Sequence, residues 1–102
     1  MNQAQLMAQV KKMQSEMAKA QEELANTTVT GNAANGTVTV EMTCDQRMKG
    51  ITIGADAVDP QDIETLEDLV TVAVNDALTK ASEAAQKRMG GLTGGMKIPG
   101  LM

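Results

Sequence analysis

A regular apolar stripe near the start of the chain most limits the folds that this sequence can adopt. Within "LMAQVKKMQSEMAKAQEEL", residues 6–24, apolar side chains recur at alternating spacings of four and three. This period of about 3.5 residues is typical of a helix that packs along another helix. It predicts a helix over residues 3–25, ended by the polar run after it. The stripe consists of Leu6, Val10, Met13, Met17, Ala20 and Leu24.

The side chains of this stripe are small or flexible, and the rest of the chain offers little more to bury. There is no aromatic residue, and Leu, Ile and Val together make up 19 of the 102 residues. A chain of this size with so few large apolar residues is hard to stabilise alone. We therefore expect a homodimer. The stripe should pack on the alanine-rich end of a second helix and on the partner copy.

Three short segments after residue 27 alternate apolar and polar residues, which is the pattern of strands with one buried face. They are "TVTG" at 28–31, "TVTVEMTC" at 37–44 and "KGITI" at 49–53. Asn35-Gly36 before the second segment is a strong signal for a tight turn. Consecutive short strands with such connections predict an antiparallel meander. Cys44 continues the alternation, so a small buried apolar role is expected for it rather than a reactive thiol.

Signals for a second helix follow an acidic segment. Asp59 is predicted to cap it, Pro60 to occupy its first position, and Asp62 to lie in an acidic first turn. Apolar residues then keep helical spacing and narrow to alanines, and Gly90 and Gly91 are predicted to end the helix. Asn75 and Asp76 lie inside this run, where a hydrogen bond that fixes packing is favoured over a role in binding a partner.

The order of elements indicates an α+β fold: helix, three-stranded antiparallel meander, long helix (αβββα). A helix of roughly 30 residues spans about 45 Å, which is more than three strands can cover, so part of it should project. Residues 1–89 are expected to form one domain. Residues 90–102, with five Gly and one Pro, are expected to form a flexible tail.

The net charge of −4 is unevenly distributed. Residues 56–68 contain six acidic residues and no Lys or Arg, so this segment carries −6, whereas the remainder has nine basic and seven acidic residues. Both helices are basic toward the chain ends. The cations on them are Lys11, Lys12, Lys19, Lys80, Lys87 and Arg88. These cations could bind a negatively charged partner, or they could form solvated ion pairs with nearby glutamates on the helix surface.

Several motifs resemble the YbaB/EbfC family of bacterial nucleoid-associated proteins. The segment "IETLEDLVTVAVNDALTKASE", residues 63–83, is similar to the family signature, above all in "LEDL" and "NDA". The Gln- and Met-rich start, "V.G.A..G.V.V" at 29–40 and "KIPG" near the end are similar too, so the resemblance covers nearly the whole chain.

The resemblance implies a homodimer whose paired helices extend as tweezer-like arms, and which binds double-stranded DNA and alters its conformation. We expect largely sequence-independent contact, because cations recognise phosphates without reading bases. The predicted DNA-binding residues are the six cations named above, with Arg47 and Lys49 as weaker candidates. The expected location is the cytoplasm and its nucleoid, since the sequence lacks a membrane span or signal peptide pattern.

Other classes of function find less support. His is absent and Cys44 is the only cysteine, so we expect no metal, no cofactor, no small-molecule substrate and no enzyme activity. The acidic segment is expected to be solvated or to support the start of the helix rather than bind a cation. The alternative function is a protein-binding, holdase-like module, because Met-lined helical arms tolerate varied apolar partners.

Overall fold

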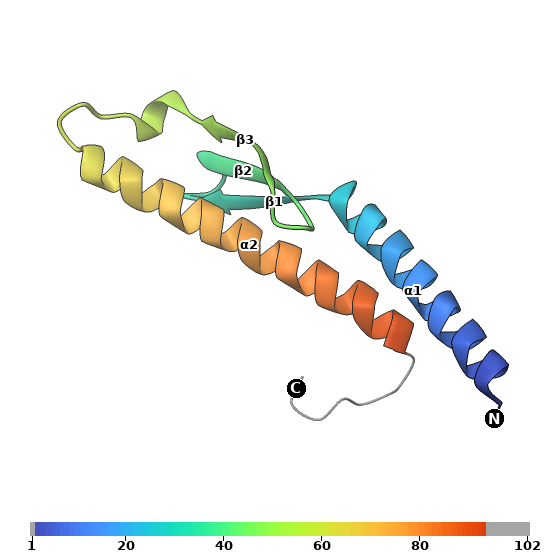
Figure 1. The fold of residues 1–102 in the computed structure, drawn as a ribbon. Helices are drawn as coiled ribbons and strands as arrows, with labels where there is room; N and C mark the ends of the chain where they lie inside the picture. The colour runs from blue at the N-terminus through green and yellow to red at the C-terminus, as the bar shows by residue number, and fades with distance from the viewer. Residues whose placement is uncertain (1, 94–102) are drawn as a thin grey trace.

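The computed structural model describes residues 2–93, and it confirms the predicted αβββα order (Figure 1). A first helix is followed by a sheet in the order β1-β2-β3, with both strand pairs antiparallel, and by a second, longer helix. None of the helices in residues 2–93 has the length and apolar character needed to cross a membrane. The elements are α1 (Gln3–Ala25), β1 (Thr28–Ala33), β2 (Val38–Thr43), β3 (Met48–Ile53), the short 3-10 helix η1 (Ala55–Ala57) and α2 (Ile63–Thr93).

The core lies between α2 and the first two strands. β2 contributes the largest fully buried side chains, those of Val38, Val40 and Met42, on the face that it turns toward α2. α2 contributes three fully buried alanines at helical spacing, Ala73, Ala77 and Ala81. Small residues on one helix face allow its backbone to approach a sheet closely. Cys44 is also buried, with an exposure of 1%, as the strand alternation predicted.

Local turn chemistry agrees with the sequence. Asn35 and Gly36 have φ angles of 57° and 89°, so both adopt the left-handed conformation that the Asn-Gly pair favours. The end of α1 is likewise as predicted, because Asn26 Nδ2 donates to the carbonyl of Glu22 and Thr27 Oγ1 to that of Glu23. These side chains satisfy carbonyls that the last helical turn leaves open.

The predicted start of α2 was wrong by three residues. Asp59 does cap, but it closes a separate turn, in which its carboxylate accepts from Gln61 N at 2.9 Å. Asp62 caps the helix itself, accepting from the amide and the hydroxyl of Thr65 at 3.2 and 2.6 Å. The Thr65 hydroxyl and then its amide lower the pKa of Asp62. Two aspartates three residues apart compete for one role, and the later one begins α2.

The predicted end of α2 was also wrong, since the helix continues through Gly90 and Gly91 to Thr93. A glycine that ends a helix usually takes a positive φ, and neither of these does. The remaining part of the predicted tail, residues 94–102, lies outside the described residues, so its expected flexibility and the boundary at residue 89 stay predictions.

The molecule is elongated, with extents of 70 × 26 × 17 Å. α1 and the second half of α2 run in opposite directions and project from the sheet (Figure 1). The expected packing of the α1 stripe on α2 is confirmed at the base of α1, where Ala20 and Leu24 are buried. Toward the tip the stripe becomes exposed, by 48% at Val10 and 52% at Leu6.

Candidate nucleic-acid interface

The two projecting helices carry all six cations that the sequence predicted as DNA contacts. Lys11, Lys12 and Lys19 lie exposed on α1, and Lys87 lies exposed near the end of α2. Within residues 2–93, the ammonium groups of these four lysines have no hydrogen bond or ion pair to the protein. A phosphate can therefore approach each of them without breaking an existing bond.

Lys80 is in a different situation, because its ammonium joins α2 to β1. Its Nζ lies 3.0 Å from Asp76 Oδ2 and donates to the carbonyl of Thr30, also at 3.0 Å. The same Asp76 oxygen accepts from Asn32 N at 3.0 Å. The amide of Asn32 first, and then the Lys80 ammonium, lower the pKa of Asp76. The preference for a packing role at Asp76 is thus confirmed, and Lys80 shares that role.

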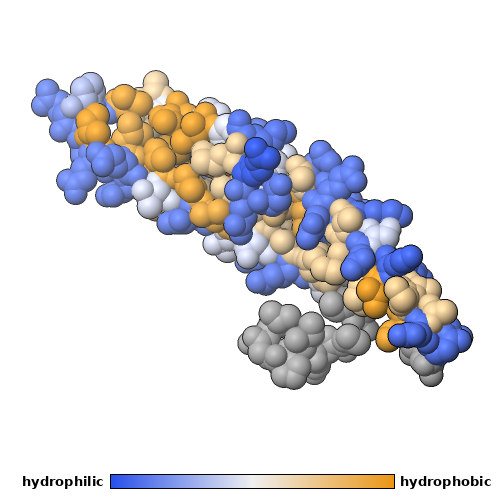
Figure 2. Space-filling view, in the orientation of Figure 1, coloured by the Kyte–Doolittle hydropathy of each residue, from blue (hydrophilic) through white to orange (hydrophobic). Residues whose placement is uncertain are grey.

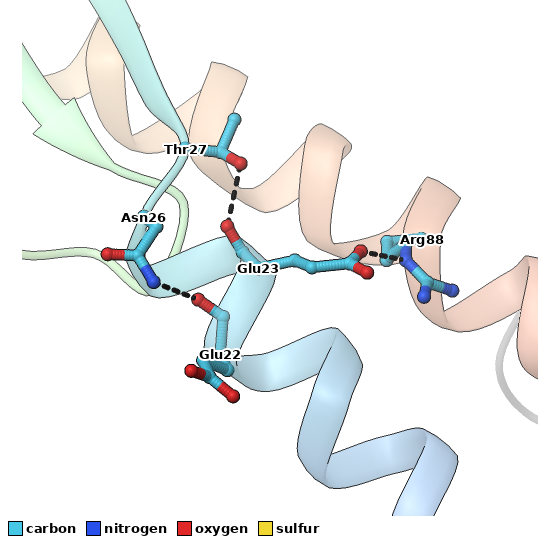
Figure 3. A network of polar contacts seen from close by, with 5 residues as sticks. All are labelled: Glu22, Glu23, Asn26, Thr27 and Arg88. Carbon is cyan, nitrogen blue, oxygen red and sulfur yellow. Dashed lines mark hydrogen bonds and ion pairs between the residues drawn. The ribbon is translucent and has the colours of Figure 1, made fainter.

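Arg88 also has a partner in the protein. Its Nε donates to Glu23 Oε2 at 2.7 Å, which connects the arms near the base of α1 (Figure 3). This contact lowers the pKa of Glu23 and raises that of Arg88. The pair is partly exposed, so it can open at small energetic cost. Arg88 therefore has the solvated pairing that was the alternative role for the arm cations.

The surface beside this pair is locally acidic. An open hollow of about 420 Å³ lies at the end of α1, lined by Lys19, Glu22, Glu23, Asn26 and Thr27. Because two carboxylates lie beside one ammonium here, this hollow is less favourable to a phosphate than the outer length of α1. The positive part of α1 is its outer length. Residues 3–20 contain three lysines and only one acidic residue, Glu16.

The strongly acidic segment lies at the opposite end of the molecule. Residues 56–68 form η1, the turns after it and the beginning of α2, whereas the cations lie along α1 and the second half of α2 (Figure 1). This arrangement separates the −6 segment from the arms. Within residues 2–93 there is no group of three His, Cys, Asp or Glu side chains placed to hold a metal ion.

The sequence indicated which helices carry the cations, but not which of these cations are free of bonds to the protein and so open to a phosphate. The four-residue spacing of Asp76 and Lys80 was visible as a possible pair on one helix face. Their bonds to Thr30 and Asn32 were not visible, because they join residues 44 and 50 positions apart. Such contacts depend on how α2 lies on β1.

Comparison with known proteins agrees with this architecture. The sequence matches the YbaB/EbfC DNA-binding family over residues 1–96. It is 50% identical over 97 residues to a nucleoid-associated protein of Chloroflexus aurantiacus, covering 95% of this chain and 97% of that protein. A nucleoid-associated protein of Lactococcus lactis is 44% identical over 96 residues, with coverages of 94% and 97%.

The fold has a counterpart among solved structures. An uncharacterized protein from Helicobacter pylori superimposes with a TM-score of 0.81, covering 92% of this chain and 99% of that one, at 20% sequence identity. That likeness supports the fold alone. Because the family match spans nearly the entire sequence and full-length relatives share up to half of its residues, the chain belongs to the YbaB/EbfC DNA-binding family of nucleoid-associated proteins.

Proposed function

We propose that this protein is a homodimer that binds double-stranded DNA through its helical arms, largely without sequence preference, and alters DNA conformation in the bacterial nucleoid. The observation that carries the proposal is a set of four exposed lysines, Lys11, Lys12, Lys19 and Lys87, which have no partner within residues 2–93. They lie on the arms, at the end away from the acidic segment. No cofactor or small-molecule substrate takes part in this function.

The side-chain chemistry of the arms favours contact with phosphates. An ammonium group neutralises a phosphate without reading the bases, so it positions a duplex but does not select a sequence. Single-strand binding usually relies on stacking against aromatic rings, and this chain has none. A duplex, whose phosphates lie at regular spacing on a rigid surface, is therefore the better partner for rows of lysines.

The surface that we assign to dimerisation is the uncovered part of the sheet. α2 packs on β1 and β2 and leaves β3 largely open. Ile51 and Ile53 are paired with Val40 and Val38, so they lie on the apolar face of the sheet. Near the start of β3, a bulge shifts the register so that Met48 pairs with Met42. Met48 is therefore a third apolar residue on the same face of the sheet as Ile51 and Ile53.

This open strip is apolar enough to need a cover. Met48, Ile51 and Ile53 are 49%, 43% and 39% exposed in the single chain. Figure 2 shows apolar residues gathered near the end of the molecule that holds η1 and the start of α2. A second copy seated there would add the buried apolar area that a chain with few large side chains lacks.

The dimer can be tested by disrupting this strip. The wild-type chain is expected to sediment with the mass of two 10.7 kDa chains at micromolar concentration. The Ile51→Asp, Ile53→Asp double variant should sediment as a single chain, because two carboxylates would lose their hydration at the interface. Thr52→Asp, on the opposite face of the same strand, is the control and should remain a dimer. A dimeric double variant would place the interface elsewhere.

DNA binding can be tested by its dependence on salt. The affinity of the wild-type protein for a short duplex of arbitrary sequence should fall linearly on a log-log plot against salt concentration. Changing Lys11, Lys12, Lys19 and Lys87 to Gln should reduce the slope by about 0.9 for each phosphate that is no longer neutralised, or up to about 3.6 per chain. Fluorescence anisotropy at several salt concentrations measures this slope.

Lys80→Gln provides a matched control for Lys87→Gln. Both variants remove one charge from the same helix, seven residues apart, but Lys80 already bonds to Asp76 and Thr30. Lys87→Gln should therefore weaken duplex binding more than Lys80→Gln. Binding that does not respond to salt or to the four substitutions would rule out phosphate contact by the arms. Suppression of a model protein's aggregation without such DNA binding would instead support the holdase-like alternative.

A further inference from the structure

Among the six predicted DNA contacts, Arg88 is the one that, within residues 2–93, bonds across to the other arm. Its Nε on α2 donates to Glu23 Oε2 on α1 at 2.7 Å (Figure 3). Lys80, the other predicted contact with a partner, bonds to Asp76 of its own helix and to β1. The Arg88 bond is therefore the place where a duplex lying on the arms would meet a competing carboxylate.

Two features make this bond easy to exchange. The side chains of Arg88 and Glu23 are 36% and 58% exposed, so solvent reaches both partners. The contact uses a single N–H, whereas a guanidinium has five and binds an oxyanion best through two of them. Figure 3 shows the terminal nitrogens of Arg88 pointing away from Glu23, and they make no hydrogen bond within residues 2–93. A phosphate could thus form the two-point contact that Glu23 does not.

The position of Glu23 is set by the end of α1. Its carbonyl accepts from the Thr27 hydroxyl at 2.7 Å and from Asn26 N at 3.1 Å, which holds the last turn of the helix. The hydrogen bond from Glu23 raises the pKa of Arg88, and the charge of Glu16, two turns earlier on α1, adds to this rise. In the protein without DNA, carboxylates of α1 therefore attract Arg88 toward that helix.

We propose that Glu23 is an autoinhibitory residue, which competes with DNA for Arg88 and holds it on α1 until a phosphate displaces the carboxylate. This inference rests on the proposed function, because it requires a duplex along the arms. Arg88 directly follows Lys87, which is exposed and has no partner within residues 2–93, so a phosphate drawn to Lys87 comes close to Arg88. Carboxylate and phosphate repel each other when both lie against one guanidinium. DNA binding therefore opens the bond between the arms.

Removing the competitor should strengthen DNA binding. Glu23→Gln is expected to raise the affinity for a short duplex roughly two- to fivefold at low salt, an effect of the size that an exposed ion pair supports. The slope of affinity against salt on a log-log plot should steepen by about 0.9 per chain, because Arg88 then neutralises one more phosphate. Fluorescence anisotropy with the full-length protein measures both.

Glu22→Gln is the matched control for charge. It removes one negative charge from the neighbouring, exposed residue, whose carboxylate has no hydrogen bond or ion pair within residues 2–93. It should strengthen binding less than Glu23→Gln. In an Arg88→Gln background, Glu23→Gln should add no affinity, because the competitor then has no arginine to release.

Two results would overturn the proposal. Equal gains from Glu22→Gln and Glu23→Gln, or a gain that persists in the Arg88→Gln background, would indicate general repulsion of DNA by the acidic end of α1. Wild-type binding that did not respond to salt is a different failure, since it would contradict the proposed function itself and this inference with it.

The bond can also be observed without DNA. The chain has two arginines, Arg47 and Arg88, so its proton–nitrogen correlation NMR spectrum should contain two side-chain Nε–H signals. Glu23→Gln should shift the Arg88 signal and leave that of Arg47, which lies just before β3, in place. Adding a duplex to the wild-type protein should shift the Arg88 signal as phosphate replaces the carboxylate. An Arg88 signal that Glu23→Gln does not move would show that the pair does not form in solution, and the proposal would be wrong.

Discussion

The Gly31→Ala variant is expected to unfold at a much lower urea concentration than the wild-type protein. Gly31 lies in β1 directly beneath α2, and a Cβ added there would come within 2.3 Å of Ala77 N and 2.4 Å of Ala73 O. Both are backbone atoms of α2, so no side-chain rotation relieves the clash. Shifting the helix should cost about 3 kcal/mol, the upper end of the usual range for overpacking. Urea denaturation followed by circular dichroism measures it.

Gly50→Ala is the matched control. Gly50 lies in β3 of the same sheet, but a Cβ added there has no atom within 4 Å. We expect a change of no more than about 0.5 kcal/mol, as for most surface substitutions. Both variants should be compared at one protein concentration, since the stability of the proposed dimer would depend on that concentration. Equal losses of stability in the two variants would show that α2 does not depend on the close approach at Gly31.

The same close approach explains why the sequence could predict the elements more easily than their placement. The three strands, the Asn35-Gly36 turn and the first helix were predicted from local patterns, and each was confirmed. The single buried face predicted for each strand is found in β1 and β2 but not in β3, which is exposed at every position in the single chain. The fit of α2 onto β1 depends on a glycine and three alanines that are far apart in the chain. A glycine inside a strand pattern allows for such an approach but does not identify its partner.

The errors arose where two local signals competed. Asp59 and Pro60 formed a plausible helix start, but Asp62 caps α2, because its carboxylate accepts from the amide and the hydroxyl of Thr65. Paired glycines are a plausible helix end, yet Gly90 and Gly91 remain in α2 at a cost of about 1 kcal/mol each. Propensity alone does not decide between such neighbours.

At the candidate interface, too, some features could be predicted from the sequence and others depend on the fold. Charge along the chain is visible in the sequence, so the separation of basic arms from residues 56–68 could be predicted before the fold was known. Whether a cation is available to a phosphate depends on its neighbours in space. Lys80 and Arg88 look equivalent to Lys87 in the sequence, but each forms a bond that joins α2 to another element.

Met42→Ala is expected to cause the second large loss of stability. Met42 is 2% exposed and is the largest fully buried side chain in residues 2–93, between β2 and the alanine face of α2. Truncation removes its apolar packing and leaves a cavity, for a cost of about 2–4 kcal/mol. The alanines opposite cannot fill this space, because they have no further atoms to move into it. The change is measurable as a lower urea midpoint.

Met42→Leu separates the effect of volume from that of the methionine itself. A swap that conserves volume should cost less than about 1.5 kcal/mol. If Met42 is mainly a filler of space, Leu will restore most of the stability that Ala removes. A destabilisation in Met42→Leu as large as in Met42→Ala would mean that the flexible shape of methionine is itself needed there. Since domains of this size are stable by only about 5–15 kcal/mol, Met42→Ala should also remove much of the tolerance for further substitutions in the arms.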